Sequence, residues 1–313
     1  MECPFCTATL PDDDAFCEEC GKPVNTPVAV QEPQACPNCG APESEIAEDG
    51  FCDRCGHRAR RPPSDHLEIV VSPDFAGVSD RGLKHQRNED RFAMRQAGDG
   101  FVLVVCDGVS SSTESELASS AVSEHVAQTL EKSLLRHSQS SPERTVRVAI
   151  EAAQEALTAA TVNKSDPPST TVVAAIVNGP DAVIGWAGDS RAYWIDAEVQ
   201  QLTTDHSWMN EVITAGVMSA ESAAHAPQAH GITRWLGADA VENAHPDVVR
   251  FKIPGPGVLL LCTDGLWNYA EDPTELAKLL GAGSCLEDAR HLINYANEQG
   301  GHDNITAILL RLQ

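Results

Sequence analysis

The order of the elements that the sequence predicts indicates an α+β fold in which two antiparallel sheets are covered by helices. Beyond about residue 67, strands come first, and two long helices, many strands, two further helices and one strand follow. Segregation of strands and helices along a chain is typical of α+β folds, whereas parallel sheets alternate strand and helix. Eight cysteines before residue 56 set the N-terminal segment apart. We therefore predict one large α+β domain, residues 67–313, preceded by small metal-stabilised modules.

The N-terminal segment repeats one cysteine plan twice, as CPxC followed by CxxCG after ten and twelve residues. Two CxxC turns offer four thiolates, which close a tetrahedron around zinc and leave no open position, so each site is structural. A redox pair or a chance spacing is the alternative, but the spacing and the repeat agree on zinc. Units this short depend on zinc binding, worth roughly 10–16 kcal/mol, for most of their folding energy. The predicted ligands of the two structural zinc ions are Cys3, Cys6, Cys17 and Cys20 in a ribbon of residues 1–21, and Cys36, Cys39, Cys52 and Cys55 in a ribbon of residues 36–57.

The charge balance argues against nucleic acid and membrane surfaces as partners. The chain has 22 basic and 46 acidic residues and a formal net charge of −24, a field that repels polyanions and attracts divalent cations and basic partners. The ribbons are acidic too, so we expect a protein partner or self-association for them. A proline-containing linker, 22–35, and a basic hinge, 58–66, separate the modules. No apolar run approaches the roughly 18 residues of a membrane helix, and the start lacks signal-peptide features, which predicts a soluble cytoplasmic protein.

Apolar runs and turn residues place the elements of the first half of the domain. Strands are predicted at 67–71 and 75–79, and a dense charged cluster, 87–91, leads into another strand. The valine-rich run 101–106 has no polar alternation, which predicts a strand buried on both faces. Serine and threonine at 110–113 are candidate caps for a helix of about 114–137. A second helix, about 142–162, begins with proline, which suits a first turn.

The second half begins after the break at Asp166-Pro167-Pro168. Strands 172–177 and 182–187 are joined by the turn sequence Asn-Gly-Pro-Asp, and a strand at 192–195 follows. Residues 207–231 are predicted to be a mostly helical surface flap, because they are poor in bulky apolar residues. The remaining predicted elements are strands at 248–253 and 258–262, helices at 273–280 and 284–298, and a last strand from 305.

Three aspartates lie where predicted buried strands end or begin. Asp107 follows the run 101–106, Asp264 comes shortly after the run 258–262, and Asp303 precedes the run 305–310. A lone buried charge is costly, and the economical partner for several converging carboxylates is a hard divalent cation bound by oxygen ligands. The residues themselves thus predict a divalent-cation site. For each aspartate taken singly, an ordinary turn at a strand end is the alternative.

Eight motifs together resemble the PPM metal-dependent protein serine/threonine phosphatases, also called type 2C. The resemblance covers about residues 67–313, and the eight motifs in register are specific although any one of them is weak. It implies a β-sandwich flanked by helix pairs in α-β-β-α layers, which agrees with the order of elements above. The motifs are Ser79-Asp80-Arg81-Gly82, Asn88-Glu89-Asp90, Asp107-Gly108, Ser169-Thr170-Thr171, Gly188-Asp189-Ser190-Arg191, Asp205-His206, Thr263-Asp264-Gly265-Leu266 and Asp303-Asn304.

The resemblance also implies a site for two Mg²⁺ or Mn²⁺ ions. The reaction would be hydrolysis of phosphoserine or phosphothreonine on proteins by a metal-bridging hydroxide, without a phosphoenzyme. Two metals about 3.5–4 Å apart can clamp a phosphoryl group and acidify a shared water. The implied catalytic metal ligands are Asp107, which bridges both ions, Asp264 and Asp303. The other implied residues of the metal site are the Gly108 carbonyl, Glu89 and Asp90 mostly through water, and Asp189 for a weaker third ion. The alternative for Asp189 is a structural role, held by Arg191 or by backbone.

Three positions depart from the family pattern. His85 stands where members commonly hold the substrate phosphate with arginine, so either Lys84 or Arg87 takes this role or phosphate is bound less tightly. Val109 cannot protonate a leaving oxygen, and Asn268 replaces an aspartate, which weakens a third metal site. The leading hypothesis is an active phosphatase, acting on phosphoproteins and targeted or regulated by its ribbons. The alternative is a pseudophosphatase that binds phosphoproteins or acts as a scaffold, although a scaffold has no need of three converging carboxylates.

Overall fold

The computed structural model describes residues 35–36, 38–47, 50–56, 63–136, 140–229, 231–240, 244–270 and 272–313. The chain divides into two compact units, Met1–Pro63 and Ser64–Gln313, each of which is described by itself. The first predicted ribbon, residues 1–21, with its four cysteines, lies outside the described residues. Among the helices that are described, none combines the length and the apolar character needed to cross a membrane.

The larger unit contains one sheet of six antiparallel strands that brings the two ends of the unit together. Its first hairpin pairs with the last strand of the chain, which in turn pairs with the strand that ends at Cys262. The segments before Asp264 and after Asp303 therefore lie next to each other in one sheet. In spatial order, the strands are β1 (His66–Ser72), β2 (Phe75–Asp80), β11 (Ile305–Leu312), β10 (Gly257–Cys262), β7 (Arg191–Ile195) and β8 (Val199–Gln201).

A second antiparallel sheet has five strands and is built mainly from hairpins. The turn between β5 and β6 is the predicted one, with Gly179 at φ 60°, a left-handed conformation that glycine adopts without strain. In spatial order, the strands are β3 (Arg91–Ala97), β4 (Gly100–Cys106), β5 (Val172–Asn178), β6 (Asp181–Ala187) and β9 (Asp247–Lys252).

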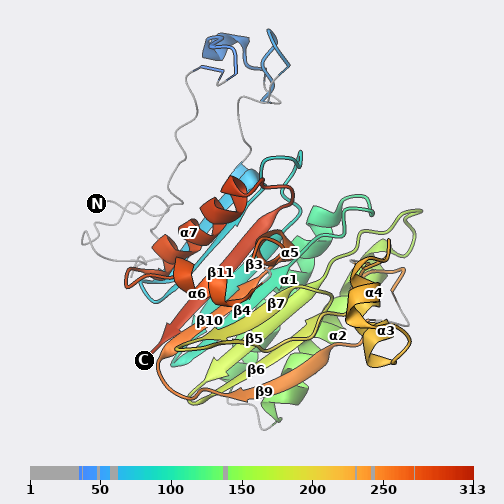
Figure 1. Cartoon of the computed structure of the whole chain (residues 1–313), viewed down its shortest axis with the longest axis vertical. Coiled ribbons are helices and arrows are strands. Elements are labelled where there is room, and N and C mark those ends of the chain that lie inside the picture. Colours follow the sequence, from blue (N-terminus) through green and yellow to red (C-terminus); the bar gives the residue numbers. More distant parts are fainter. Residues whose placement is uncertain are drawn as a thin grey trace. The chain divides into compact units, whose positions relative to one another are not determined.

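Three hydrophobic clusters bind these sheets and the helices into four layers, which confirms the predicted α-β-β-α sandwich (Figure 1). Successive side chains of β4 belong to different clusters: Val104 and Cys106 face the helices, whereas Leu103 and Val105 face the other sheet. Both faces of this strand are buried, as its unbroken apolar run predicts. The helices α1 (Ser115–Leu135) and α2 (Pro142–Thr161) cover the five-stranded sheet, and α5 (Asp264–Trp267), α6 (Thr274–Leu279) and α7 (Cys285–Glu298) cover the other.

The helix boundaries agree closely with the sequence, but the capping residue expected for α1 does not. Ser141 caps α2 by accepting from the Arg144 N–H at 3.3 Å, and proline occupies the first turn as expected. The expected cap from residues 110–113 is wrong, because α1 begins after Glu114, which has φ 57° and makes no side-chain capping bond. The predicted flap contains two short helices, α3 (Trp208–Thr214) and α4 (Ala220–Ala224). The one-turn helix α5 was not predicted.

Candidate active site

The acidic cluster, defined as Asp90, Asp107, Asp189, Asp264 and Asp303, forms where strands of both sheets end. Asp107 follows β4 and Asp90 precedes the neighbouring strand β3, so the two flank the paired residues at 91 and 106. Asp264 opens α5 directly after β10, and Asp303 precedes the adjacent strand β11. The sandwich therefore delivers carboxylates from both sheets to one place, as the sequence predicted for three of them.

Burial and mutual repulsion raise the pKa values of Asp107, Asp264 and Asp189. Burial raises the pKa of Asp107 well above its ordinary value, and the charges of Asp90, Asp264 and the other aspartates add to the rise. Burial, with the nearby charge of Asp303, raises the pKa of Asp264 to about 6. Burial and the charge of Asp264 likewise raise the pKa of Asp189. The ionised forms are therefore disfavoured together, and a bound cation would remove this penalty.

Asp90 is the aspartate of the cluster whose surroundings most clearly suit a cationic partner. Its side chain is fully buried, and its Oδ2 accepts hydrogen bonds from the hydroxyls of Thr263 at 2.8 Å and Thr306 at 2.7 Å. Its Oδ1 is also buried but has no hydrogen-bond partner among the described residues. Burial raises the pKa of this carboxyl to about 7 against the two hydrogen bonds that lower it. An orphaned carboxylate oxygen inside an all-oxygen cluster suits a hard divalent cation, held directly or through water.

Glu89 is held by serine hydroxyls that the sequence did not single out. Its two carboxylate oxygens accept from Ser110 Oγ at 2.9 Å and from Ser115 Oγ at 2.7 Å. A Cβ at Gly108 would lie only 2.8 Å from the Glu89 carbonyl oxygen, so the backbone after Asp107 must be glycine to approach this closely. Ser110, which is exposed, thus has a hydrogen-bond partner in the site. The contribution of Glu89 to a metal ion through water stays a prediction.

The three candidate phosphate-binding residues lie differently with respect to the cluster. His85 Nε2 is 3.2 Å from Asp303 Oδ1, so its ring is at the cluster. The Arg87 guanidinium, whose side chain is 68% exposed, pairs with Glu116 on α1 at 3.0 Å. Lys84 is exposed, and its backbone N–H donates to the Gly301 carbonyl. As it stands, the structure brings only His85 of the three into contact with an aspartate of the cluster.

Asn304 fixes the loop that carries these residues. Its Oδ1 accepts from the Glu89 N–H at 2.8 Å, and its Nδ2 donates to the carbonyls of Arg81 at 2.8 Å and Arg87 at 2.9 Å. One side chain therefore ties the start and the end of the loop to the segment that carries Asp303. The motif Asp303-Asn304 was recognised in the sequence, but this role of the amide is visible only in the structure.

The segment around Asp189 is braced by Trp267 of α5. The indole Nε1–H donates to the Asp189 carbonyl at 3.0 Å, and the Arg191 guanidinium lies over the indole ring, 3.5 Å from its centroid. Arg191 pairs through both branches of its fork with Asp205, at 2.8 and 2.6 Å. Asn268 donates to Asp264 Oδ2 at 3.2 Å. The bidentate ion pair of this arginine is thus with Asp205, whereas the Asp189 carboxylate belongs to the acidic cluster.

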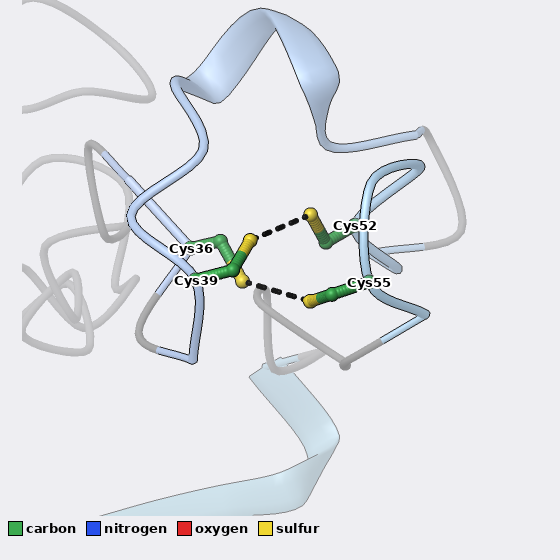
Figure 2. A group of neighbouring side chains, drawn as sticks. All are labelled: Cys36, Cys39, Cys52 and Cys55. Carbon is green, nitrogen blue, oxygen red and sulfur yellow. Dashed lines mark hydrogen bonds between the residues drawn. The ribbon is translucent and has the colours of Figure 1, made fainter.

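Four cysteines of the second predicted ribbon gather in the smaller unit, as Figure 2 shows. The sulfur of Cys36 is 3.7 Å from that of Cys55, and the sulfur of Cys39 is 3.6 Å from that of Cys52. Four thiolates placed ~2.3 Å from a tetrahedral zinc ion stand about 3.8 Å apart, so these residues fit zinc. Each CxxC turn closes on a glycine with positive φ whose N–H donates to the first cysteine's carbonyl.

The two candidate metal centres differ in compactness. Within the described part of the chain, the cysteine group is the one set of three or more metal-binding side chains whose ligand atoms all lie within 4.8 Å of one another. The carboxylates of the acidic cluster are spread more widely, since no three of them meet this condition. A site shared by two ions and water tolerates this spread better than a site for one ion.

Comparisons with known proteins agree on both parts of the chain. Residues 81–307 match the family model described as protein phosphatase 2C, and residues 3–56 match the model described as double zinc ribbon. The serine/threonine phosphatase stp of Listeria monocytogenes is 30% identical over 237 residues, which cover 74% of this chain and 93% of the relative. Protein phosphatase PhpP of Streptococcus pneumoniae is 34% identical over 146 residues, 46% of this chain and 58% of the relative.

Solved structures show the same likeness. The serine/threonine phosphatase Stp1 from Staphylococcus aureus is similar with a TM-score of 0.68 and 29% identity, covering 79% of this chain and 98% of the other. The catalytic domain of the serine/threonine protein phosphatase PstP, described as a complex with two manganese ions, is similar with a TM-score of 0.63 and 25% identity, covering 76% of this chain and 98% of the other.

Proposed function

The chain belongs to the protein phosphatase 2C family, and we propose that it hydrolyses phosphoserine and phosphothreonine on proteins with divalent cations held by the acidic cluster. The observation that carries the proposal is the convergence of buried and half-buried aspartates. Asp90, Asp107 and Asp264 among them have raised pKa values, and Asp90 keeps an oxygen without a hydrogen-bond partner among the described residues. Such a cluster is costly for a protein that has no cation to put in it.

The residues that would hold the metal ions supply only oxygen donors. Asp107, the Gly108 carbonyl, Asp264 and Asp303 would hold the two ions. When bound, the ions would polarise the phosphoryl group and lower the pKa of an attacking water. Two further carboxylates, Glu89 and Asp90, would contribute through water, and Asp189 would contribute to a weaker third site. Both Mn²⁺ and Mg²⁺ suit such donors, and the manganese in the PstP structure favours Mn²⁺ as the first ion to test.

The protein's own side chains would orient the substrate. His85 is placed at the rim of the cluster through its contact with Asp303, where a ring N–H can donate to a phosphate oxygen. It lacks the bidentate fork of arginine, so we expect weaker phosphate binding than an arginine would give. Arg87 reaches the phosphate only if it leaves Glu116, a half-exposed ion pair worth at most about 1 kcal/mol. Val109 has no proton to give, so a water molecule would protonate the leaving oxygen.

The net charge and the ribbons would determine which phosphoproteins and partners the chain binds. A net charge of −24 favours phosphorylated segments that carry basic residues and disfavours acidic ones. The double zinc ribbon would bind a protein partner or a second copy of the chain, and thereby target or regulate the phosphatase, in the cytoplasm. A phosphoprotein-binding role without turnover is disfavoured, because the cluster of like charges that the structure keeps serves no purpose in a scaffold.

Activity against a panel of substrates tests this function. The full chain with Mn²⁺ is expected to release phosphate from an aryl phosphate and from phosphoserine and phosphothreonine peptides, faster when basic residues flank the phosphate. Asp264→Ala should abolish this release, whereas Asp99→Asn, in the exposed turn between β3 and β4, should not change it. Metal binding without turnover of any phosphorylated peptide would overturn the proposal in favour of a binding protein.

A further inference from the structure

The chain enters the larger unit at a short junction segment, Ser64–His66, which is the end of the basic hinge and leads into β1. Asp65 in this segment is 1% exposed, although most aspartates lie at the surface unless they are paired. Its Oδ2 is 3.2 Å from Arg81 Nε, and its backbone carbonyl accepts from the Arg81 N–H at 2.8 Å. The junction segment is therefore fixed to Arg81 through both side chain and backbone.

Arg81 begins the loop that carries the candidate phosphate-binding residues, here called the His85 loop, residues 81–87. The same guanidinium that faces Asp65 donates through its NH1 group to the His85 carbonyl. The His85 ring in turn contacts Asp303 of the acidic cluster. A continuous chain of polar contacts thus runs from the junction segment through Arg81 and His85 to the site.

His66, in the same junction segment, supports the His85 loop through a second contact. His66 Nδ1 lies 2.8 Å from Asp80 Oδ2, and the other oxygen of Asp80 accepts from the Gly82 N–H at 2.8 Å. Beyond Gly82, the N–H groups of Leu83 and Lys84 donate to the carbonyl of residue 301. Both residues of the junction segment that follow Ser64 therefore hold the start of the His85 loop.

We propose that Asp65 is a positioning residue for phosphate binding: through Arg81 it holds the His85 loop against the acidic cluster. The proposal rests on the function proposed above, and it adds a residue that touches neither substrate nor metal. The end of the basic hinge, where the chain enters the larger unit, and the His85 loop are therefore held by the same residue. The loss of this support should act on substrate binding rather than on the chemical step.

The experiment compares Asp65→Asn with a matched control in the full chain. Glu68→Gln removes one carboxylate charge from β1, the strand that follows Asp65. Glu68 pairs with Arg290 at 2.8 and 2.6 Å, and its Oε1 lies 3.2 Å from His66 Nε2, a contact that the amide oxygen of glutamine can keep. Asp65→Asn should raise KM for a phosphothreonine peptide roughly ten- to a hundredfold and change kcat little. This pattern is expected when a contact that stabilises the bound substrate and the transition state equally is lost. Glu68→Gln should leave both constants unchanged.

Hydrogen exchange of the loop provides a readout that needs no activity. Asp65→Asn should speed exchange of the Leu83 and Lys84 amides, and Glu68→Gln should not. If Asp65→Asn does not fold, Arg81→Lys serves, because lysine keeps a charge near Asp65 but lacks the fork that also reaches the His85 carbonyl. It should raise KM and loop exchange in the same way.

The outcomes separate this inference from the function itself. Unchanged exchange and KM in Asp65→Asn, or equal changes in Glu68→Gln, would overturn the role of Asp65. If instead no phosphorylated substrate is hydrolysed by any variant while the loop exchange responds to Asp65→Asn alone, the proposed function fails and the support of the loop by Asp65 stands.

Discussion

Asp90→Asn should stabilise the metal-free catalytic unit at neutral pH and at the same time weaken its binding of metal. Burial, with the charges of Asp303 and Asp264, raises the pKa of Asp90 from 3.8 to about 7, although hydrogen bonds from Thr306 and Thr263 oppose the rise. A shift of about 3 units corresponds to about 4 kcal/mol, at ~1.4 kcal/mol per unit. The neutral amide of asparagine has nearly the same shape, can still accept from both threonines, and avoids the cost of a buried charge.

The sign of the pH dependence follows from the direction of this shift. The folded protein holds the proton of Asp90 up to about pH 7, whereas the unfolded chain releases it near pH 4. The stability that this group contributes is therefore present below about pH 4 and is lost as the pH rises through about 7. The advantage of Asp90→Asn over the wild type should grow from near zero at pH 4 to at most about 4 kcal/mol at pH 8.

Urea unfolding with EDTA, followed by tryptophan fluorescence at pH 4.5, 6 and 8, measures this difference. All five tryptophans lie in the unit Ser64–Gln313, so loss of zinc from the ribbons does not disturb the signal. Asp99→Asn, in an exposed turn, is the control and should unfold like the wild type at each pH. Added Mn²⁺ should raise the stability of the wild type more than that of Asp90→Asn. A variant that is less stable than the wild type without metal at pH 8, or whose advantage does not depend on pH, would refute the reasoning.

Three further predictions concern the supports of the site and the ribbon. Thr306→Val removes one of the two hydroxyls that donate to Asp90 and should raise the Kd for Mn²⁺, measured by calorimetry, about 10- to 100-fold. An unchanged Kd would contradict a positioning role for Thr306. Asp205→Asn leaves the half-buried Arg191 without its charge partner and should cost about 3–5 kcal/mol in urea unfolding, against less than ~1 kcal/mol for a surface pair. Cys52→Ser should lower the zinc content by about one ion per chain in metal analysis without shifting the unfolding of the catalytic unit that tryptophan reports, and a shift of that transition would show that the two units are coupled.

The order of the elements and three aspartates of the acidic cluster could be predicted because they depend on local patterns, whereas Asp90 and Asp189 were implied only by the family resemblance. The unbroken apolar run 101–106 has no polar alternation, which indicates a strand buried on both faces, and Asp107 follows it directly. The positions of Asp264 and Asp303 follow from the same rule. Their convergence was inferred from charge, because isolated carboxylates at buried strand ends need a shared partner.

The supports of the cluster could not be predicted, because they join residues far apart in the chain. Thr263 and Thr306 reach Asp90 across 173 and 216 residues, and a threonine within or beside an apolar strand resembles an ordinary β-branched residue in sequence. The cap of α1 was mispredicted for a related reason, since Ser110, one of the expected caps, donates its hydroxyl to Glu89 and does not cap the helix. The local pattern assigned this hydroxyl to the nearest backbone, and the tertiary contact prevailed.

The most direct test of the account is phosphate release from a phosphothreonine peptide, measured as Mn²⁺ is titrated into the full chain and into Asp107→Asn side by side. The account predicts saturable, Mn²⁺-dependent release by the wild type and a loss of at least about a hundredfold in kcat/KM in the variant. Release that needs no divalent cation, or that Asp107→Asn leaves unchanged, would contradict the assignment of the acidic cluster as the catalytic metal site.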